Sequence, residues 1–237
     1  MCQNCADNSL SRRRLLAGTG ALLAASAVAP AIVRAADEPA ANAIPPSEAF
    51  EQIMQGNARY IANDPKERDF SVGRAARAEG QAPIVGVLAC ADSRVPPEIV
   101  FDQGPGKVFV VRDAGNVVST YGLASLEFGV AVLGIPLLLV LGHSNCGAVA
   151  AAMQSARERK KLPGHLPELV EAIQPAVNEA HGKHPSDLLE ATTRENVRLG
   201  MRNLKTKSDI IGKAVRDGKV AIKGGVYDLA TGKIDMV

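Results

Sequence analysis

Apolar runs and helical stretches alternate along most of the chain. Residues 84–89, 108–111 and 136–141 form short, nearly uninterrupted apolar runs, which are typical of strands buried on both faces of a sheet. Between the second and the third run, apolar residues recur at helical spacing over 123–133. This strand–helix–strand order predicts a mainly parallel central β-sheet flanked by helices.

The rest of the sequence extends the same pattern. An amphipathic helix is predicted to begin at Ser47, with apolar residues near helical spacing from Phe50 to Tyr60. Further helical segments are predicted over 148–156, 166–180 and 188–215. Two closing runs, 220–227 and 233–237, predict strands, the last of them an antiparallel strand at the C-terminal edge. The economical fold is therefore a single α/β domain.

The N-terminal residues are patterned as an export signal. Arg12, Arg13 and Arg14 stand directly before the uncharged stretch 15–33, and the small residue Ala35 follows it. A cationic start, a mildly apolar centre and a small-residue exit are typical of a signal peptide, and the paired arginines resemble the twin-arginine (Tat) type.

That pattern divides the chain into a twin-arginine-type signal peptide (1–35), a flexible linker (36–46) and a folded domain (47–237). A retained membrane anchor is the alternative for the uncharged stretch. Small and polar residues and Pro30 interrupt it, so no stable anchor is expected. Export through the Tat machinery would bring the domain to the periplasm or otherwise outside the cytoplasm.

Composition narrows the classes of partner. The chain has 27 Lys and Arg against 25 Asp and Glu, a formal charge of +2, and its aromatic residues are three Tyr and five Phe. Such a weak charge and so few aromatic rings argue against nucleic acid as a partner. Cleavage after Ala35 would leave 23 basic and 24 acidic residues, so the excess positive charge belongs to the signal.

Four cysteines are too sparse for a disulfide scaffold. Cys2 and Cys5 lie in the signal, where no strand or helix frames them, so no site is assigned to them. Cys90 follows the run 84–89 directly.

His143 and Cys146 follow the run 136–141. The carboxyl ends of parallel strands meet at one edge of the sheet, so Cys90, His143 and Cys146 are expected to lie close together. Two thiolates and an imidazole with an open fourth position suit a catalytic Zn²⁺ site. A disulfide between Cys90 and Cys146, or an inert core position for each residue, are the alternatives. The remaining histidines, which are predicted to face solvent, are His165, His181 and His184.

Three segments resemble the signatures of β-class carbonic anhydrases. They are residues 90–98 (CADSRVPPE), 109–116 (FVVRDAGN) and 142–148 (GHSNCGA). The similarity extends from about Phe50 to the closing strands. Residues 47–237 are thereby identified as a β-carbonic-anhydrase-like catalytic domain.

The resemblance implies a zinc enzyme that reversibly hydrates CO₂ to bicarbonate and a proton. By that analogy Cys90, His143 and Cys146 hold one Zn²⁺ per subunit. A zinc-bound hydroxide would attack CO₂, since zinc lowers the pKa of a bound water to about 7. The resemblance also implies a homodimer or a higher homo-oligomer, with the pocket near the subunit interface.

Asp92 and Arg94 are the catalytic candidates. The resemblance implies that Asp92 pairs with Arg94 and either closes the site as a fourth zinc ligand or accepts a hydrogen bond from the zinc-bound water. Arg94 could instead merely neutralise a structural aspartate. The family's form with an inhibitory bicarbonate pocket carries Trp three residues before the first cysteine, where this chain has Val87. The resemblance therefore favours the open, water-ligated form.

The resemblance also assigns a substrate pocket. Its members are Gln81, Val95, Phe109, Phe128 and Gly147. An apolar wall suits CO₂, which is uncharged and must leave water to react. Apart from the resemblance, Phe109 and Phe128 could equally be core residues.

Three other functions remain open. Relatives of the predicted fold act on carbon disulfide or carbonyl sulfide, and the ligand set does not distinguish them. A zinc-storage protein would have no need of Asp92 and Arg94 beside the ligands. Thiol redox chemistry by Cys90 and Cys146 would require both thiols to be free of metal.

Overall fold

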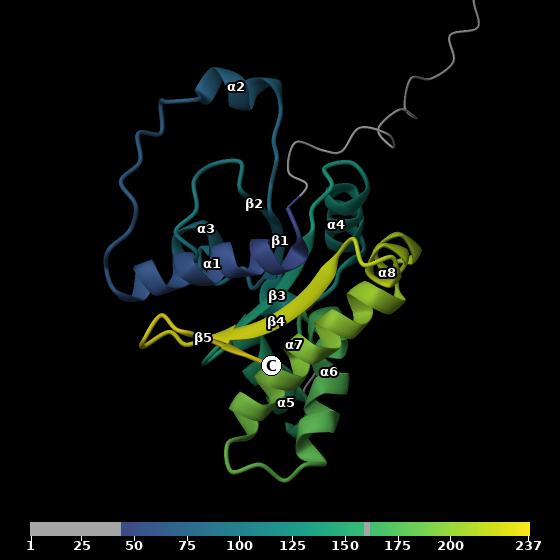
Figure 1. Ribbon diagram of the computed structural model, residues 1–237. Helices are drawn as coiled ribbons and strands as arrows, with labels where there is room; N and C mark the ends of the chain where they lie inside the picture. The colour runs from purple at the N-terminus through teal and green to yellow at the C-terminus, as the bar shows by residue number, and fades with distance from the viewer. Residues whose placement is uncertain (1–43, 159–161) are drawn as a thin grey trace, which may run out of the picture. The chain divides into compact units, whose positions relative to one another are not determined.

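The computed structural model describes residues 44–158 and 162–237 (Figure 1). The predicted signal peptide 1–35 and all but the last three residues of the predicted linker 36–46 lie outside these ranges, so both remain predictions. Among the helices that are described, none is long and apolar enough to span a membrane.

A five-stranded sheet confirms the predicted α/β fold. Its strands, in the spatial order β2-β1-β3-β4-β5, are β1 (Val85–Ala89), β2 (Val108–Arg112), β3 (Leu137–His143), β4 (Ala221–Tyr227) and β5 (Ile234–Met236). Strands β1 to β4 are parallel, and β5 pairs with β4 antiparallel at the C-terminal edge. Every residue of β1 and β3 is buried, which explains why these two strands have no polar alternation.

Helices flank the sheet on both faces. They are α1 (Pro46–Ile61), α2 (Arg74–Glu79), α3 (Pro97–Val100), α4 (Thr120–Ala131), α5 (Gly147–Glu158), α6 (Leu166–His181), α7 (Leu188–Thr206) and α8 (Asp209–Arg216), with a 3₁₀ turn η1 at Ala114–Asn116. The helical segment predicted over 188–215 is two helices, because the Ser208 hydroxyl accepts from the Ile211 N–H and caps a new helix. The short elements α2, α3 and η1 were not predicted.

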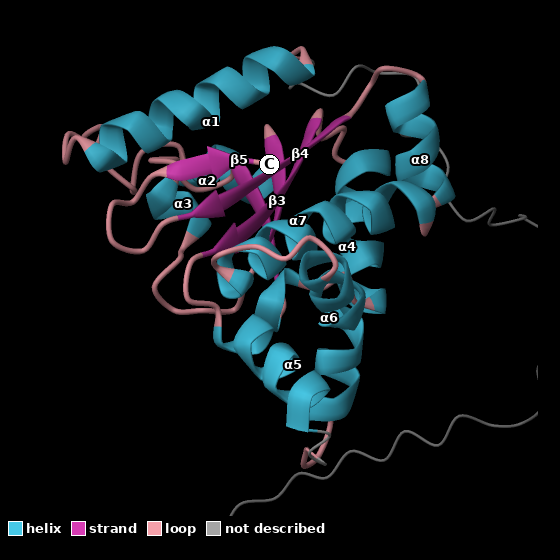
Figure 2. Cartoon of the chain, turned by 90° about the horizontal axis from the view of Figure 1, so that it is seen from below, coloured by secondary structure: helices cyan, strands magenta, loops and turns pink. Residues whose placement is uncertain are grey.

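The two faces of the sheet have separate cores (Figure 2). Helix α1 covers one face, where Ile53 packs with Leu139 and its neighbours. Helices α4, α7 and α8 cover the other face around Val140. At Gly142 the packing is close, since a Cβ there would lie 2.7 Å from a methyl group of Val197 on α7. Helix α7 is therefore held directly against the end of β3.

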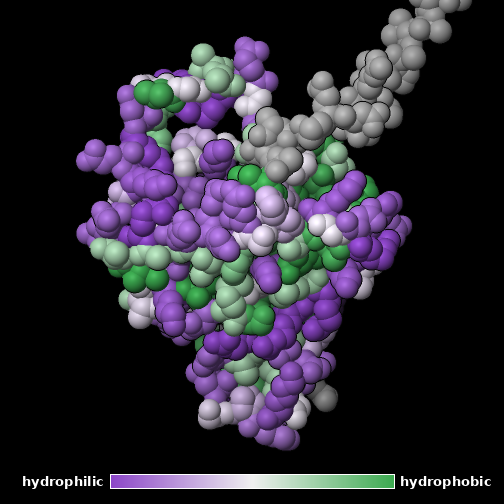
Figure 3. Space-filling view, viewed as in Figure 1, coloured by the Kyte–Doolittle hydropathy of each residue, from purple (hydrophilic) through white to green (hydrophobic). Residues whose placement is uncertain are grey.

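One segment makes little contact with either core. Residues 62–80, here called the arm, carry α2, and Figures 1 and 3 show the arm standing clear of the sheet and its helices. No residue of α2 is buried, and Phe70 and Val72 are both more than half exposed. The arm therefore presents apolar side chains that this chain alone does not cover.

Candidate metal centre

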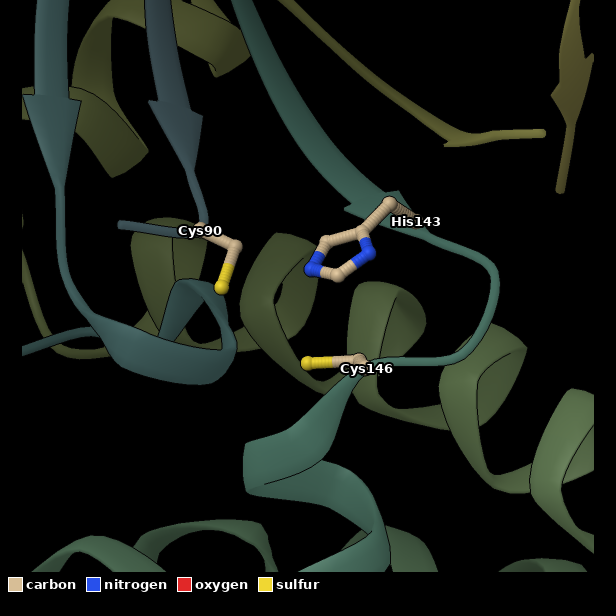
Figure 4. A group of neighbouring side chains, drawn as sticks. All are labelled: Cys90, His143 and Cys146. Carbon is tan, nitrogen blue, oxygen red and sulfur yellow. The ribbon is translucent and has the colours of Figure 1, made fainter. Parts of the chain in front are cut away.

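Three side chains meet at the carboxyl end of the sheet. Cys90 follows β1, His143 is the last residue of β3, and Cys146 directly precedes α5. Their ligand atoms all lie within 4.8 Å of one another, and all three residues are buried (Figure 4). The convergence predicted from the sequence is thus present.

Strand pairing and one turn explain the convergence. Strands β1 and β3 are hydrogen-bonded neighbours with Ala89 opposite Leu141, so Cys90 and His143 emerge at the same edge. Asn145 adopts a left-handed conformation, with φ 54°. Asparagine tolerates this region, and the resulting turn brings Cys146 back beside His143.

The His143 ring is oriented as a metal ligand. Its Nδ1 lies 2.9 Å from the Ser144 carbonyl oxygen, so Nδ1 carries the proton and donates to that oxygen. Nε2 is buried and has no hydrogen-bond partner within the described residues. A buried ring nitrogen with a free lone pair, beside two sulfur atoms, is the arrangement that a metal ion completes.

The charge states of Cys90, His143 and Cys146 also favour a bound cation. Cys90 and Cys146 are free thiols, so the disulfide alternative is wrong. A hydrogen bond from Cys146 lowers the pKa of Cys90 to about 4, while the resulting thiolate raises the pKa of Cys146. Burial lowers the pKa of His143, but the nearby Cys90 sulfur, the Ser144 carbonyl and Asp92 together raise it above its ordinary value. One negative charge shared among buried S and N donors fits a soft divalent cation, and Zn²⁺ suits this donor set.

Asp92 lies at the edge of the ligand cluster and is held by Arg94. Its Oδ1 accepts from the Arg94 backbone N–H and from Nε, both at 2.9 Å, and its Oδ2 accepts from Nη2 at 2.7 Å. Oδ2 also lies 3.7 Å from His143 Nε2. The hydrogen bonds from Arg94 hold the pKa of the Asp92 carboxyl well below its usual range. Asp92 is therefore an ionised acceptor beside the ligands, fixed by a bidentate pair.

Three further residues support this site and were not recognised as supports from the sequence. Arg112 donates from Nε to the Cys90 carbonyl at 3.0 Å and from Nη2 to the Asp92 carbonyl. The Gly115 N–H donates to Cys90 Sγ at 3.2 Å. Ser144 accepts at Oγ from the Leu229 N–H. These contacts join residues that are 20 to 85 positions apart in the chain, so no short sequence pattern predicts them.

The predicted pocket residues occupy different parts of the fold. Gly147 directly follows Cys146 and is exposed at the start of α5. Val95 is buried in the core beneath α1, and Phe109 packs in the core on the α4 face. Gln81 is exposed just after the arm, and Phe128 is 48% exposed on α4. Their roles as substrate contacts remain predictions.

The remaining histidines follow the expectation. His165, His181 and His184 are all exposed. None of them belongs to a cluster of potential metal ligands within the described residues.

Comparisons with known proteins agree on one family. The family model described as "Carbonic anhydrase" matches residues 85–234. A curated relative, carbonic anhydrase 2 of Mycobacterium tuberculosis, is 38% identical over 189 residues, covering 79% of this chain and 91% of that protein.

Solved structures show the same fold. The Coccomyxa β-carbonic anhydrase in complex with acetazolamide is 28% identical, with a TM-score of 0.61 over 81% of this chain and 85% of that one. One of the β-carbonic anhydrases from Sordaria macrospora, described as tetrameric, is 24% identical, with a TM-score of 0.64 over 80% of this chain and 97% of that one.

Proposed function

The chain belongs to the β-class carbonic anhydrase family and is a carbonic anhydrase, and from that premise we propose that it hydrates CO₂ reversibly to bicarbonate and a proton with one Zn²⁺ per subunit. The observation that carries the proposal is the buried set of Cys90, His143 and Cys146 with an unpaired Nε2. When bound there, zinc supplies a Lewis acid that lowers the pKa of a water molecule to about 7.

Asp92 is the proposed hydrogen-bond acceptor for the reacting water. Its Oδ2 lies 3.7 Å from the His143 ring nitrogen, which brings a carboxylate to the edge of the ligand set. Arg94 occupies both carboxylate oxygens and so keeps Asp92 ionised and turned toward itself. A carboxylate held in this way can accept a hydrogen bond from the water without itself becoming a ligand. This supports the open form, with the fourth position left to water.

We also propose a homo-oligomer, in which a second copy completes the substrate pocket with Gln81, Phe109 and Phe128. Apart from Glu127, the side chains of α4 are apolar or uncharged, and Tyr121, Phe128 and Val132 stay exposed along one side. A helix that is apolar on all sides is normally buried on all sides. The exposed α4 side and the arm supply the apolar surface that such an interface needs.

Export is proposed on sequence grounds alone. The arginines at positions 12–14 and the small-residue stretch that follows support a Tat-type signal over 1–35. Tat substrates cross the membrane folded. Zinc could therefore occupy Cys90 and Cys146 before the thiols meet an oxidising compartment.

The test is stopped-flow CO₂ hydration on the purified chain, with zinc measured on the same sample by atomic emission. We expect about one zinc per chain and rapid hydration, and the matched variant Cys146→Ser should lose both. Full zinc occupancy with negligible hydration would sink the proposal. Turnover of carbon disulfide or carbonyl sulfide in that same sample would redirect it. Thiols that react with DTNB in the zinc-loaded protein would contradict the ligand roles.

A further inference from the structure

The Cys90 sulfur is held by a backbone hydrogen bond from a turn. Gly115, in the 3₁₀ turn η1, donates its N–H to Cys90 Sγ at 3.2 Å, and both groups are buried. Gly115 adopts a left-handed conformation with φ 66° and ψ 22°. A Cβ there would lie 2.8 Å from Ile173 Cδ1 and 3.1 Å from the Ala148 Cβ. Glycine is thus required for the turn, but glycine itself does little to hold a conformation.

A buried amide on α7 holds that turn from the other side. Asn196, only 4% exposed, donates from Nδ2 to the Gly115 carbonyl oxygen at 2.7 Å. The two residues are 81 positions apart, so this bond ties η1 to a helix from the second half of the domain. Gly142 allows α7 to press against the end of β3, which also carries His143. The amide is therefore presented from a rigid element that is fixed relative to a second ligand.

We propose that Asn196 is a positioning residue for the metal ligand Cys90, acting through Gly115. The Asn196 amide fixes the Gly115 carbonyl. The φ and ψ angles of Gly115 set the direction of its N–H relative to its own carbonyl. The hydrogen bond from Asn196 to that carbonyl therefore also directs the Gly115 N–H toward Cys90 Sγ. This N–H withdraws electron density from the Cys90 sulfur and fixes the orientation of the Cys90 side chain. The inference rests on the proposed function only in taking Cys90 as a zinc ligand.

Loss of the amide has two measurable consequences. Removing a group that orients a metal ligand typically weakens metal affinity by about 10- to 100-fold. A sulfur that loses its N–H donor holds its lone pairs less tightly. The sulfur-to-metal charge-transfer band of a cobalt-substituted protein should then move to longer wavelength.

The experiment uses Asn196→Leu, which keeps the size of the side chain but removes the donor. Asn196→Ser is the milder variant, because its hydroxyl is too short to reach the carbonyl at the present distance. The matched control is Thr192→Val on the same helix. Thr192 is fully buried, but its hydroxyl bonds to the Leu188 carbonyl within α7. Each variant is checked for a native circular dichroism spectrum. Zinc dissociation constants are then measured by competition with a chromophoric chelator, and spectra are recorded after Co²⁺ substitution.

We expect both Asn196 variants to bind zinc at least about 10-fold more weakly and to shift the cobalt band to longer wavelength. Thr192→Val should leave both readouts at wild-type values. Wild-type affinity and an unmoved band in a folded Asn196 variant would overturn the assignment. Equal changes in Thr192→Val would do the same, because they would show general loosening of α7. CO₂ hydration enters neither readout, so failure here is distinguishable from failure of the proposed activity.

Discussion

Two aspartates ten positions apart both pair with arginine, yet they have different tasks. Asp92 follows β1, and its side chain is 17% exposed and paired with Arg94. The side chain of Asp102 follows α3, is 1% exposed and lies between Arg59 and Arg68. Carboxylate and guanidinium groups thus form an ion pair at the edge of the ligand cluster in one case and a buried cluster in the other.

The Asp102 cluster is a structural junction. Oδ2 accepts from Arg59 Nε at 2.5 Å and from the Lys66 backbone N–H at 3.3 Å, while Oδ1 accepts from Arg68. Burial raises the pKa of Asp102, but the hydrogen bonds from Arg68 and Arg59 outweigh it and lower the pKa to about 2. The cluster joins α1 and the base of the arm to the turn after α3.

The two aspartates differ in the groups that surround the carboxylate. Asp102 is enclosed by donors from two segments, Arg59 on α1 and Lys66 and Arg68 in the arm. Asp92 is held from one side by Arg94 and lies 3.7 Å from the Nε2 atom of His143 on another. An aspartate–arginine pair therefore indicates function only where the fold brings it to a ligand set.

Of the substitutions at the two aspartates, Asp92→Asn is expected to have the largest effect. The amide has nearly the same shape but is an uncharged and weaker hydrogen-bond acceptor for the reacting water, so kcat/KM for CO₂ hydration should fall by about 10²- to 10³-fold. Zinc content and melting temperature should stay close to wild type, because Arg94 is largely exposed and is solvated when unpaired. Stopped-flow kinetics, metal analysis and calorimetry on one preparation measure all three. A variant with undiminished turnover would remove Asp92 from the mechanism.

Asp102→Asn should show the opposite profile. Asparagine tolerates the left-handed φ of 45° at this position, so the substitution isolates the charge from the backbone. Two arginines lose a buried counter-charge, and the free energy of unfolding should fall by about 2–3 kcal/mol. Hydration per folded molecule should be unchanged. Urea unfolding and hydration rates normalised to the concentration of active sites test this prediction. A large loss of activity in a fully folded variant would show that Asp102, like Asp92, is needed for catalysis.

The strands and the ligands were predictable from sequence for one reason. Strands β1 and β3 are buried at every residue, so each one appears as an apolar run, and a ligand follows or ends each run. Parallel pairing then brings Cys90 and His143 to one edge without further information. Asp92 could be found for the same reason, since it lies two residues beyond Cys90.

The supports were not predictable because they depend on distant contacts. Asn196 lies within an ordinary amphipathic helix, and only the packing of α7 against β3 shows that its amide reaches Gly115. Asp102 looks like a polar loop residue until the arm returns Arg68 to it. The break before α8 was missed because the capping Ser208 stands inside an otherwise continuous helical pattern.

The smallest expected effect is a difference in acid stability between wild type and Asp102→Asn. The folded pKa of Asp102 is about 2, below the unfolded value near 3.8. Its contribution is therefore fully present above about pH 4 and is lost as the pH falls toward 2. The free energy of unfolding of wild type should exceed that of Asp102→Asn by about 2–3 kcal/mol at pH 6, and the difference should shrink toward zero as the pH falls through about 2. Zinc is released from both proteins by acid, so this common loss cancels in the difference. Urea titrations at several pH values measure it. A difference that persists unchanged at pH 2 would show that Asp102 acts through packing and not through its charge.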